Sequence, residues 1–168
     1  MIQYQFFPRS VGVTPEMEGV IQCFRNVEKQ ISSTDTKLSS DSVLKTVKSH
    51  LEQIGFTVEA GKKTSQKIKV PVLYGLNNRI DKYFNADAVS ADGRTVLEIE
   101  AGRALDNFNF LKDIFEASMM SGVEFLVLVV RNQYRHSNDF QKIHVFLETM
   151  FISGRIVLPL KGILLIGY

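Results

Sequence analysis

The chain has 168 residues, a hydrophobic content of 45%, a charged content of 23% and a formal net charge of +2 at neutral pH. These values are ordinary for a globular protein, and the length suits one domain with a core of its own, while the charge is too small to establish a nucleic-acid partner. A single cysteine, Cys23, excludes an intrachain disulfide, and neither a signal peptide nor an apolar run of roughly 20 residues is present, so we expect a cytoplasmic protein without a membrane partner.

Two helices are predicted in the first third of the chain. Residues 1–14 have the pattern of an extended arm or a short edge strand. A helix over Pro15–Ile31 follows, because Thr14 can cap it, Pro15 suits its first position and its apolar residues recur with a helical period. After a polar break, a second helix is predicted from Asp41, as its cap, to Ile54, with Gly55 closing it.

A basic stretch with little apolar content follows the second helix. Residues 56–60 are predicted to form a short strand, and residues 61–69 a loop with four lysines. Such a loop is either solvated or placed to contact phosphate groups. Pro71 limits residues 70–74 to an edge strand at most, and residues 75–82 are predicted to form a polar turn or a helical turn. The basic side chains proposed to contact a phosphate backbone here are Lys62, Lys63, Lys67, Lys69, Arg79 and Lys82.

The most informative stretch, residues 84–102, is predicted to be a β-hairpin. Asp92-Gly93 is expected to form its turn, of type I′, which sets Val89 opposite Val96. One face then carries Asn85, Asp87 and Val89 against Val96, Glu98 and Glu100. The other face carries Phe84, Ala86 and Ala88 against Leu97, Ile99 and Ala101, and its apolar character calls for a helix.

This register brings acidic side chains together. Asp87 faces Glu98 in it, and facing carboxylates about 5 Å apart repel by about 3 kcal/mol at an effective dielectric near 20. A hard divalent cation with oxygen ligands would offset the repulsion. The simpler interpretation is a solvated polar face, and a three-residue turn would send Asp87 and Glu98 to opposite faces.

The second half of the chain alternates helices with apolar segments. A helix is predicted over Arg103–Ser121, then a strand over Val123–Val130 that is buried on both faces and parallel to the second hairpin strand. Asp139 is expected to cap a helix through Ile152, and at least one of the apolar segments 156–160 and 163–166 should be a strand. The pattern predicts an α/β fold with a central mixed β-sheet flanked by helices.

These residues resemble the PD-(D/E)xK nuclease superfamily. The resemblance rests on NADAV (85–89), VLEIEAGRA (96–104), FLKDIF (110–115) and VEFLVLVVRN (123–132). Glu100 stands where the superfamily usually has lysine, which is similar to restriction endonucleases of the BamHI and BglII branch. The resemblance implies a restriction-endonuclease-like core over residues 41–132 of a single domain, preceded by an arm and helix (1–40) and followed by a helix and strands (133–168).

The resemblance also implies roles for individual residues. Asp87 and Glu98, helped by the Ile99 carbonyl, would bind Mg²⁺ or, as a substitute, Mn²⁺, and Glu100 would orient or deprotonate the attacking water. Glu52 is the candidate ligand of a second metal. Because glutamate cannot supply the positive charge of the usual lysine, that charge must come from a second metal or from Arg103, whose alternative role is a salt bridge to Glu100.

The function expected from this resemblance is metal-dependent hydrolysis of DNA phosphodiesters, without an organic cofactor. The alternative is a catalytically inactive module on the same fold that binds nucleic acid or another protein. Segments 62–69 and 131–136 are the candidates for target recognition. A palindromic target would match a homodimer, with the first helix as one candidate for the dimer surface.

Overall fold

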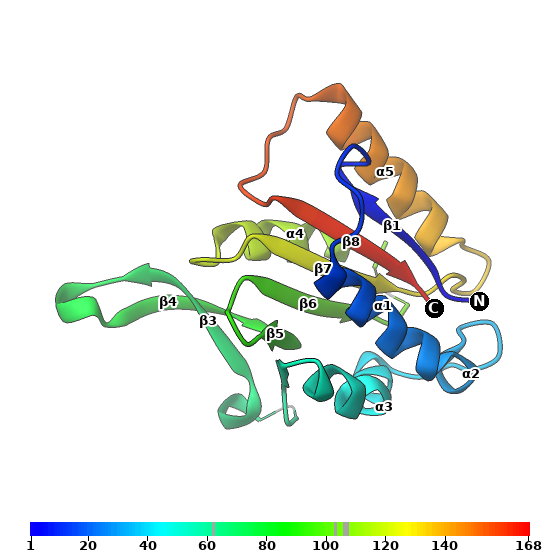
Figure 1. The fold of residues 1–168 in the computed structure, drawn as a ribbon, viewed down its shortest axis with the longest axis horizontal. Helices are drawn as coiled ribbons and strands as arrows, with labels where there is room; N and C mark the ends of the chain where they lie inside the picture. Colours follow the sequence, from blue (N-terminus) through cyan, green and yellow to red (C-terminus); the bar gives the residue numbers. More distant parts are fainter. Residues whose placement is uncertain (62, 103, 106–107) are drawn as a thin grey trace.

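A mixed β-sheet forms the centre of the molecule (Figure 1). The computed structural model describes residues 1–61, 63–102, 104–105 and 108–168, and within these ranges the sheet has six strands in the order β1-β8-β7-β6-β5-β2. Strands β6, β7 and β8 are parallel, and the remaining pairs are antiparallel. The strands are β1 (Gln3–Phe7), β2 (Phe56–Val58), β5 (Ala88–Ser90), β6 (Thr95–Glu100), β7 (Phe125–Val130) and β8 (Gly162–Gly167).

Helices cover both faces of this sheet. The buried side chains of α1, α2 and α3 share one apolar core with one face of β6 and β7, and those of α4 and α5 share a second core with the other face. The helices are α1 (Pro15–Asn26), α2 (Glu28–Ile31), α3 (Ser40–Gln53), α4 (Asn109–Met119) and α5 (Asp139–Ser153). The predicted α/β fold with a central mixed sheet flanked by helices is confirmed, and it is compatible with a restriction-endonuclease-like core.

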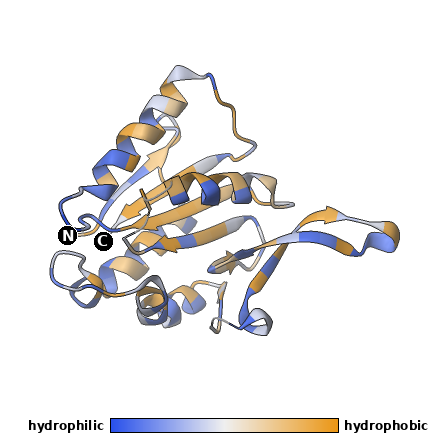
Figure 2. Ribbon diagram, turned by 180° about the vertical axis from the view of Figure 1, so that it is seen from behind, coloured by the Kyte–Doolittle hydropathy of each residue, from blue (hydrophilic) through white to orange (hydrophobic). Residues whose placement is uncertain are grey.

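The central strands follow from their apolar sequences. Residues 126–130 of β7 are all buried, as are all residues of β8, and both strands appear hydrophobic along their length in Figure 2. Strand β7 runs parallel to β6 as predicted, with α4 in the crossover. The N-terminal arm is the edge strand β1, paired with β8, and of the two late apolar segments residues 163–166 belong to a strand. No helix in the described part of the chain is long and apolar enough to cross a membrane.

Several predicted element ends are wrong. The single helix predicted over Pro15–Ile31 is two helices, because the backbone leaves the helical conformation at Val27. Ser39, and not Asp41, caps α3 by accepting a hydrogen bond from the Ser42 N–H. Asp139 is the first residue of α5 and not its cap. The helix predicted from Arg103 begins at residue 109, and Arg103 itself lies outside the described residues.

A two-stranded ribbon projects from the body of the molecule, and it was not predicted. It consists of β3 (Ile68–Tyr74) and β4 (Ile80–Ala86), joined by a tip that includes a 3₁₀ turn over Leu76–Asn78. Residues 75–82, predicted to form a turn or a helical turn, contain this 3₁₀ turn but also include the start of the seven-residue strand β4. The two strands pair with each other and not with the central sheet, so the β3–β4 ribbon extends to one side (Figure 1).

Candidate active site

The hairpin β5–β6 has the register that the sequence predicts. Val89 faces Val96 and Ala88 faces Leu97. Asp87 directly precedes Ala88, and Glu98 directly follows Leu97. Ala88, Leu97 and Ile99 are buried in the core that contains α1 and α3, as expected of the apolar face.

The turn of this hairpin is not the predicted type I′. Its closing hydrogen bond runs from the Gly93 N–H to the Ser90 carbonyl at 2.9 Å, and of the pair Asp92-Gly93 only Gly93 has a positive φ, +72°. The Asp92 carboxylate accepts hydrogen bonds from the Ser90 hydroxyl (2.6 Å) and the Arg94 N–H (3.0 Å). A turn of a different type therefore preserves the register.

A bend at Asp87 separates β4 from β5, and it changes the predicted faces. The predicted register sets Asn85 opposite Glu100. In the structure Asn85 instead pairs with Lys69 of the β3–β4 ribbon. Ala86 is buried in the core under α4 and not with Ala88. The predicted strand from 84 to 90 is thus broken because its first half belongs to the ribbon.

Asp87 is fixed by the neighbouring strand. Its Oδ2 accepts a hydrogen bond from the Ile99 N–H at 2.9 Å. Burial raises the Asp87 pKa to about 6, although this hydrogen bond opposes the rise. Burial, and then the negative charges of Asp87 and Asp113, raise the pKa of Glu98 well above its usual range. The two carboxyl groups therefore resist being charged together.

Glu100, at the end of β6, meets Asp113 on α4. The two side chains share a hydrogen bond, and burial together with the charge of Asp113 raises the pKa of Glu100 to about 7. Asp113 is 5% exposed, its Oδ2 has no hydrogen-bond partner, and burial raises its pKa as well. Lys112 partly offsets these charges, with its Nζ 3.5 Å from Asp113 Oδ1 and 3.4 Å from Glu116 Oε2.

A second acid–lysine pair lies on the opposite side of Asp87. Glu59, which follows β2, is 7% exposed, and its Oε2 lies 2.6 Å from Lys67 Nζ. Burial opposes the charge on Lys67, but the hydrogen bond and the charge of Glu59 outweigh it and raise the lysine pKa. The Glu59 N–H also donates to the Asp87 carbonyl at 2.9 Å, which ties this pair to the start of β5.

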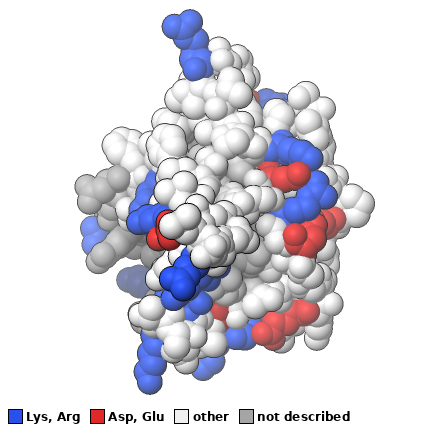
Figure 3. Space-filling model, turned by 90° about the vertical axis from the view of Figure 1, so that its left-hand side faces the viewer, with Lys and Arg blue, Asp and Glu red and all other residues white. Residues whose placement is uncertain are grey.

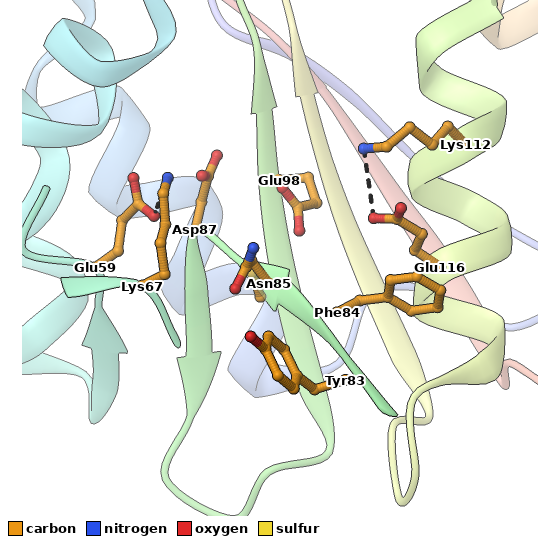
Figure 4. Close-up of a pocket in the computed structure, with 10 residues that line it drawn as sticks. Glu59, Lys67, Tyr83, Phe84, Asn85, Asp87, Glu98, Lys112 and Glu116 are labelled. Atoms are coloured by element: carbon orange, nitrogen blue, oxygen red, sulfur yellow. Dashed lines mark ion pairs between the residues drawn. The ribbon is translucent and has the colours of Figure 1, made fainter. Parts of the chain in front are cut away.

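These side chains surround a cleft of about 320 Å³ (Figure 4). Asp87 and Glu98 lie between the two lysines in this view, with Lys67 beside Glu59 and Lys112 beside Glu116. Aromatic and amide groups from the base of the β3–β4 ribbon close the lower side. The cleft is lined by Glu59, Lys67, Tyr83, Phe84, Asn85, Ala86, Asp87, Glu98, Lys112 and Glu116.

The structure brings only part of the predicted site together. Asp87 and Glu98 line the cleft, whereas Glu100 lies outside its lining, against Asp113. Glu52, proposed as a second metal ligand, lies on the exposed side of α3, pairs with Lys48 at 3.7 Å and does not line the cleft. Lys67 is in the cleft, whereas Lys63 is exposed outside it. The remaining basic residues, Lys69, Arg79 and Lys82, are exposed on the β3–β4 ribbon, and Lys62 and Arg103 lie outside the described residues.

Four residues of the site were missed as functional candidates, and two of them had a sequence signal. Asp113 stands three residues after Phe110 and four before Ala117, which puts a carboxylate on the buried side of α4. Lys112 directly precedes Asp113 in the sequence, so the position of Asp113 is the signal for both residues. Glu59 and Glu116 gave no signal, because their approach to the cleft depends on how β2 and α4 pack against the hairpin.

The donor set suits a hard divalent cation. No group of three His, Cys, Asp or Glu side chains converges as a complete metal site within the described ranges. Mg²⁺ does not require one, since it is usually held by one or two carboxylates, water and substrate phosphates. Two carboxyl groups with raised pKa values in one cleft fit this mode of binding.

The chain was also compared with known proteins. No model of a known protein family matches it, and no curated protein matches it.

Proposed function

We propose that this protein is a metal-dependent nuclease that hydrolyses phosphodiester bonds of DNA at the cleft between β5, β6 and α4. The observation that carries the proposal is the pair Asp87, directly before β5, and Glu98 on β6, whose side chains both line the cleft. Placing two acids in one partly buried cleft raises both pKa values, a cost that a bound cation would remove.

Asp87 and Glu98 would hold Mg²⁺ or Mn²⁺ with the Ile99 carbonyl. The Ile99 N–H already points to Asp87, and the N–H and C=O of one strand residue face the same neighbour. When bound, the metal supplies a Lewis acid for the phosphoryl oxygen and lowers the pKa of a coordinated water. The two carboxylates would fix its position relative to the scissile phosphate.

Glu100 is the proposed general base. Its raised pKa of about 7 lies near neutral pH, where a base combines a useful deprotonated fraction with enough basicity to take a proton from water. When Glu100 is deprotonated, a protonated Asp113, whose pKa burial raises, would donate the hydrogen bond that orients the Glu100 carboxylate. Asp113 is thus proposed as a positioning residue for Glu100.

Lys67 and Lys112 are proposed to supply the positive charge that Glu100 cannot. Both line the cleft, on opposite sides of Asp87 and Glu98, and the neighbouring acids keep both charged. A phosphodiester in the cleft would place its non-bridging oxygens between them. Lysine at such a position stabilises charge as the pentavalent phosphate forms.

The second candidate function is a module on this fold that binds nucleic acid or another protein without cleavage. It is favoured by the glutamate at the position where the superfamily usually has lysine. For the nuclease we propose DNA as the partner and a homodimer for a palindromic target, and for either function the cytoplasm as the compartment.

The proposal is tested by incubating supercoiled and linear DNA with the purified protein in Mg²⁺, Mn²⁺ or EDTA. We expect metal-dependent nicking by the wild type that Asp87→Ala and Glu98→Ala each abolish, because neither carboxylate alone would hold the metal. Glu52→Ala is the matched control, since Glu52 lies away from the cleft.

Two results would contradict the proposal. Absence of cleavage in both metals, on several DNA and RNA substrates, would favour the binding module. Cleavage that survives both substitutions would identify a contaminating nuclease and leave the cleft without this role.

A further inference from the structure

The β3–β4 ribbon begins at the cleft and leads away from it. Tyr83, Phe84 and Asn85, near the end of β4, line the cleft, while the rest of the ribbon extends from the body (Figure 1). Each strand has seven residues, so at about 3.4 Å per residue the paired region spans roughly 20 Å. A ligand in the cleft that continues to this side would therefore lie beside the ribbon.

The outer part of the ribbon exposes apolar side chains that do not serve the core. Leu76 at the tip is 89% exposed and Leu73 is 61% exposed, with Tyr74 and Ile80 also exposed beside them. An isolated two-stranded ribbon is marginally stable in water, and clustered exposed apolar groups usually mark a contact surface. The exposed apolar side chains therefore indicate that the outer part of the ribbon is a contact surface for a partner.

The charge of the ribbon is complementary to a polyanion. It carries Lys69, Arg79 and Lys82 against a single acid, Asp81. Lys69 Nζ lies 4.6 Å from the centre of the Tyr83 ring, and Lys82 Nζ lies 5.4 Å from that of Phe84, so both ammonium groups stand on rings that line the cleft. Figure 3 views the molecule from this side, and Lys and Arg groups are prominent on the face.

The tip has the side-chain types that read base edges. Asn77 and Asn78 have φ values of 58° and 59°, a conformation that asparagine tolerates better than most residues, so the tight tip presents two amides next to Leu76 and Arg79. In the major groove, arginine pairs with guanine, asparagine with adenine, and apolar groups contact the thymine methyl.

We propose that the β3–β4 ribbon enters the major groove of duplex DNA whose backbone occupies the cleft, and that its tip contacts base edges. This inference rests on the proposed function for the placement of the backbone. The major groove of B-form DNA, about 12 Å wide, admits a two-stranded ribbon, whereas that of A-form RNA is deep and narrow. The roughly 20 Å reach corresponds to about 6 base pairs at 3.4 Å per step.

The test compares two double variants that change the same chemistry at different places. The ribbon variant is Leu76→Ser with Arg79→Ala. The control is Val157→Ser with Arg155→Ala, on the exposed connection between α5 and β8, where Val157 is 88% exposed against 89% for Leu76. Each variant loses one positive charge and one exposed aliphatic side chain, so a general electrostatic effect would appear in both. Circular dichroism verifies that both variants fold.

Binding is measured by fluorescence anisotropy with labelled 30-base-pair duplex DNA, duplex RNA of the same sequence and single-stranded DNA, in EDTA to prevent hydrolysis. We expect the wild type to prefer duplex DNA over duplex RNA at least tenfold. The ribbon variant should lose about 10- to 100-fold in affinity for duplex DNA, and the control less than threefold. Methyl green, a major-groove ligand, should compete with the protein, and the minor-groove ligand distamycin should not.

Three results would overturn the inference. They are no binding of duplex DNA by the wild type, equal affinity for duplex DNA and duplex RNA, and equal affinity of the ribbon variant and the wild type for duplex DNA. If sedimentation shows that the ribbon variant has lost a wild-type dimer while its DNA affinity is unchanged, the ribbon is instead a contact between two copies of this chain.

A small substrate separates this inference from the proposed function. Bis(p-nitrophenyl) phosphate is too short to bridge the cleft and the ribbon tip, so the ribbon variant should hydrolyse it at the wild-type rate, while Asp87→Asn should not hydrolyse it. Ribbon-dependent DNA binding without any hydrolysis would remove the nuclease proposal and leave the ribbon contact intact. Hydrolysis together with DNA binding that does not depend on the ribbon would leave the nuclease proposal intact and remove the ribbon contact.

Discussion

Charged side chains are paired differently at the two ends of the parallel strands β6, β7 and β8. At the amino ends of β6, β7 and β8 stand Arg94, Glu124 and Lys161, and the Glu124 carboxylate accepts a hydrogen bond from the Arg94 guanidinium while lying 2.9 Å from Lys161 Nζ. These hydrogen bonds lower the pKa of Glu124. Each charge in this amino-end cluster therefore has an opposite charge beside it.

Toward the carboxyl end of β6, acids face acids. Asp87, Glu98, Glu100 and Asp113 all have raised pKa values, chiefly because burial disfavours their charged forms. The lysines of the cleft lie to the sides of Asp87 and Glu98, where Lys67 pairs with Glu59 and Lys112 with Glu116 and Asp113.

This difference indicates that the amino-end cluster has a structural role and that the carboxyl-end cluster has a role in binding a ligand. A compensated surface cluster needs no further partner and adds little to stability. A partly buried cluster whose charges are only partly offset lowers stability, and natural proteins retain such groups mainly where activity needs them. Substitutions at the two ends should therefore have different consequences for activity and for stability.

The largest effect is expected from the proposed base. Glu100→Ala should lower metal-dependent DNA cleavage by about 100-fold or more, because general base catalysis typically contributes that much. Glu124→Ala, at the amino-end cluster, should leave the rate within twofold of the wild type. Initial rates of plasmid nicking at saturating Mg²⁺ measure both. Equal losses in the two variants would mean that the carboxyl-end cluster has no special role.

The lysines of the cleft are expected to have the next largest effect. Lys67→Ala and Lys112→Ala should each lower kcat about 10- to 100-fold, because each removes a charge that would stabilise the phosphoryl transition state. Lys161→Ala is the control from the amino-end cluster, with kcat unchanged. If kcat stays at the wild-type value in both cleft variants, their proposed role is wrong.

The stability of the carboxyl-end cluster should depend on pH in a defined direction. Asp87 and Glu100 have folded pKa values of about 6 and 7, above the value near 4 of an unfolded carboxyl group, so between these values the folded state binds more protons. Their contribution to stability is therefore lost as pH rises from about 4 to 7.

The direction of this pH dependence of stability is measured by the difference in Tm between Asp87→Asn and the wild type, both without metal. The difference should be near zero at pH 4 and reach roughly 2–5 °C in favour of the variant at pH 8, because the amide carries no charge that burial would disfavour. A difference that stays constant or reverses sign over this range would contradict the assigned pKa shifts.

The smallest effect is expected at the amino-end cluster. Glu124→Gln should lower Tm by at most about 2 °C in low salt, and the loss should disappear near 1 M NaCl, where exposed charges are screened. A scanning calorimetry series in NaCl measures this. A loss that persists in high salt would indicate that packing, and not charge, accounts for it.

Much of the fold was predictable because buried positions of helices and strands carry apolar residues in a recognisable sequence pattern. The helical stripe from Met17 to Phe24 and the apolar runs of β7 and β8 are buried as their patterns indicate. The hairpin register also followed from counting out from Asp92-Gly93, although the turn type did not. Apolar alternation on the paired strands restricts register more strongly than it restricts turn conformation.

The remaining features depend on contacts that the sequence pattern does not encode. The β3–β4 ribbon has no buried face over most of its length, so its strands lack the alternation that identifies β-structure. The bend at Asp87 follows from this transfer of the chain between two sheets. Asp87 and Glu98 were found because they are close together in one predicted hairpin, whereas Glu59 and Glu116 come from separate elements that tertiary packing brings to the cleft.

The most direct test of the account is a calorimetric titration with Mn²⁺ at pH 8 and at pH 6. It uses the wild type, Asp87→Asn, Glu98→Gln and the amino-end control Glu124→Gln. We predict binding by the wild type and the control, a loss of at least tenfold in affinity for the two carboxyl-end variants, and weaker binding at pH 6, because protons compete for carboxylates with raised pKa values. The same Mn²⁺ affinity in all four proteins at both pH values would contradict the account.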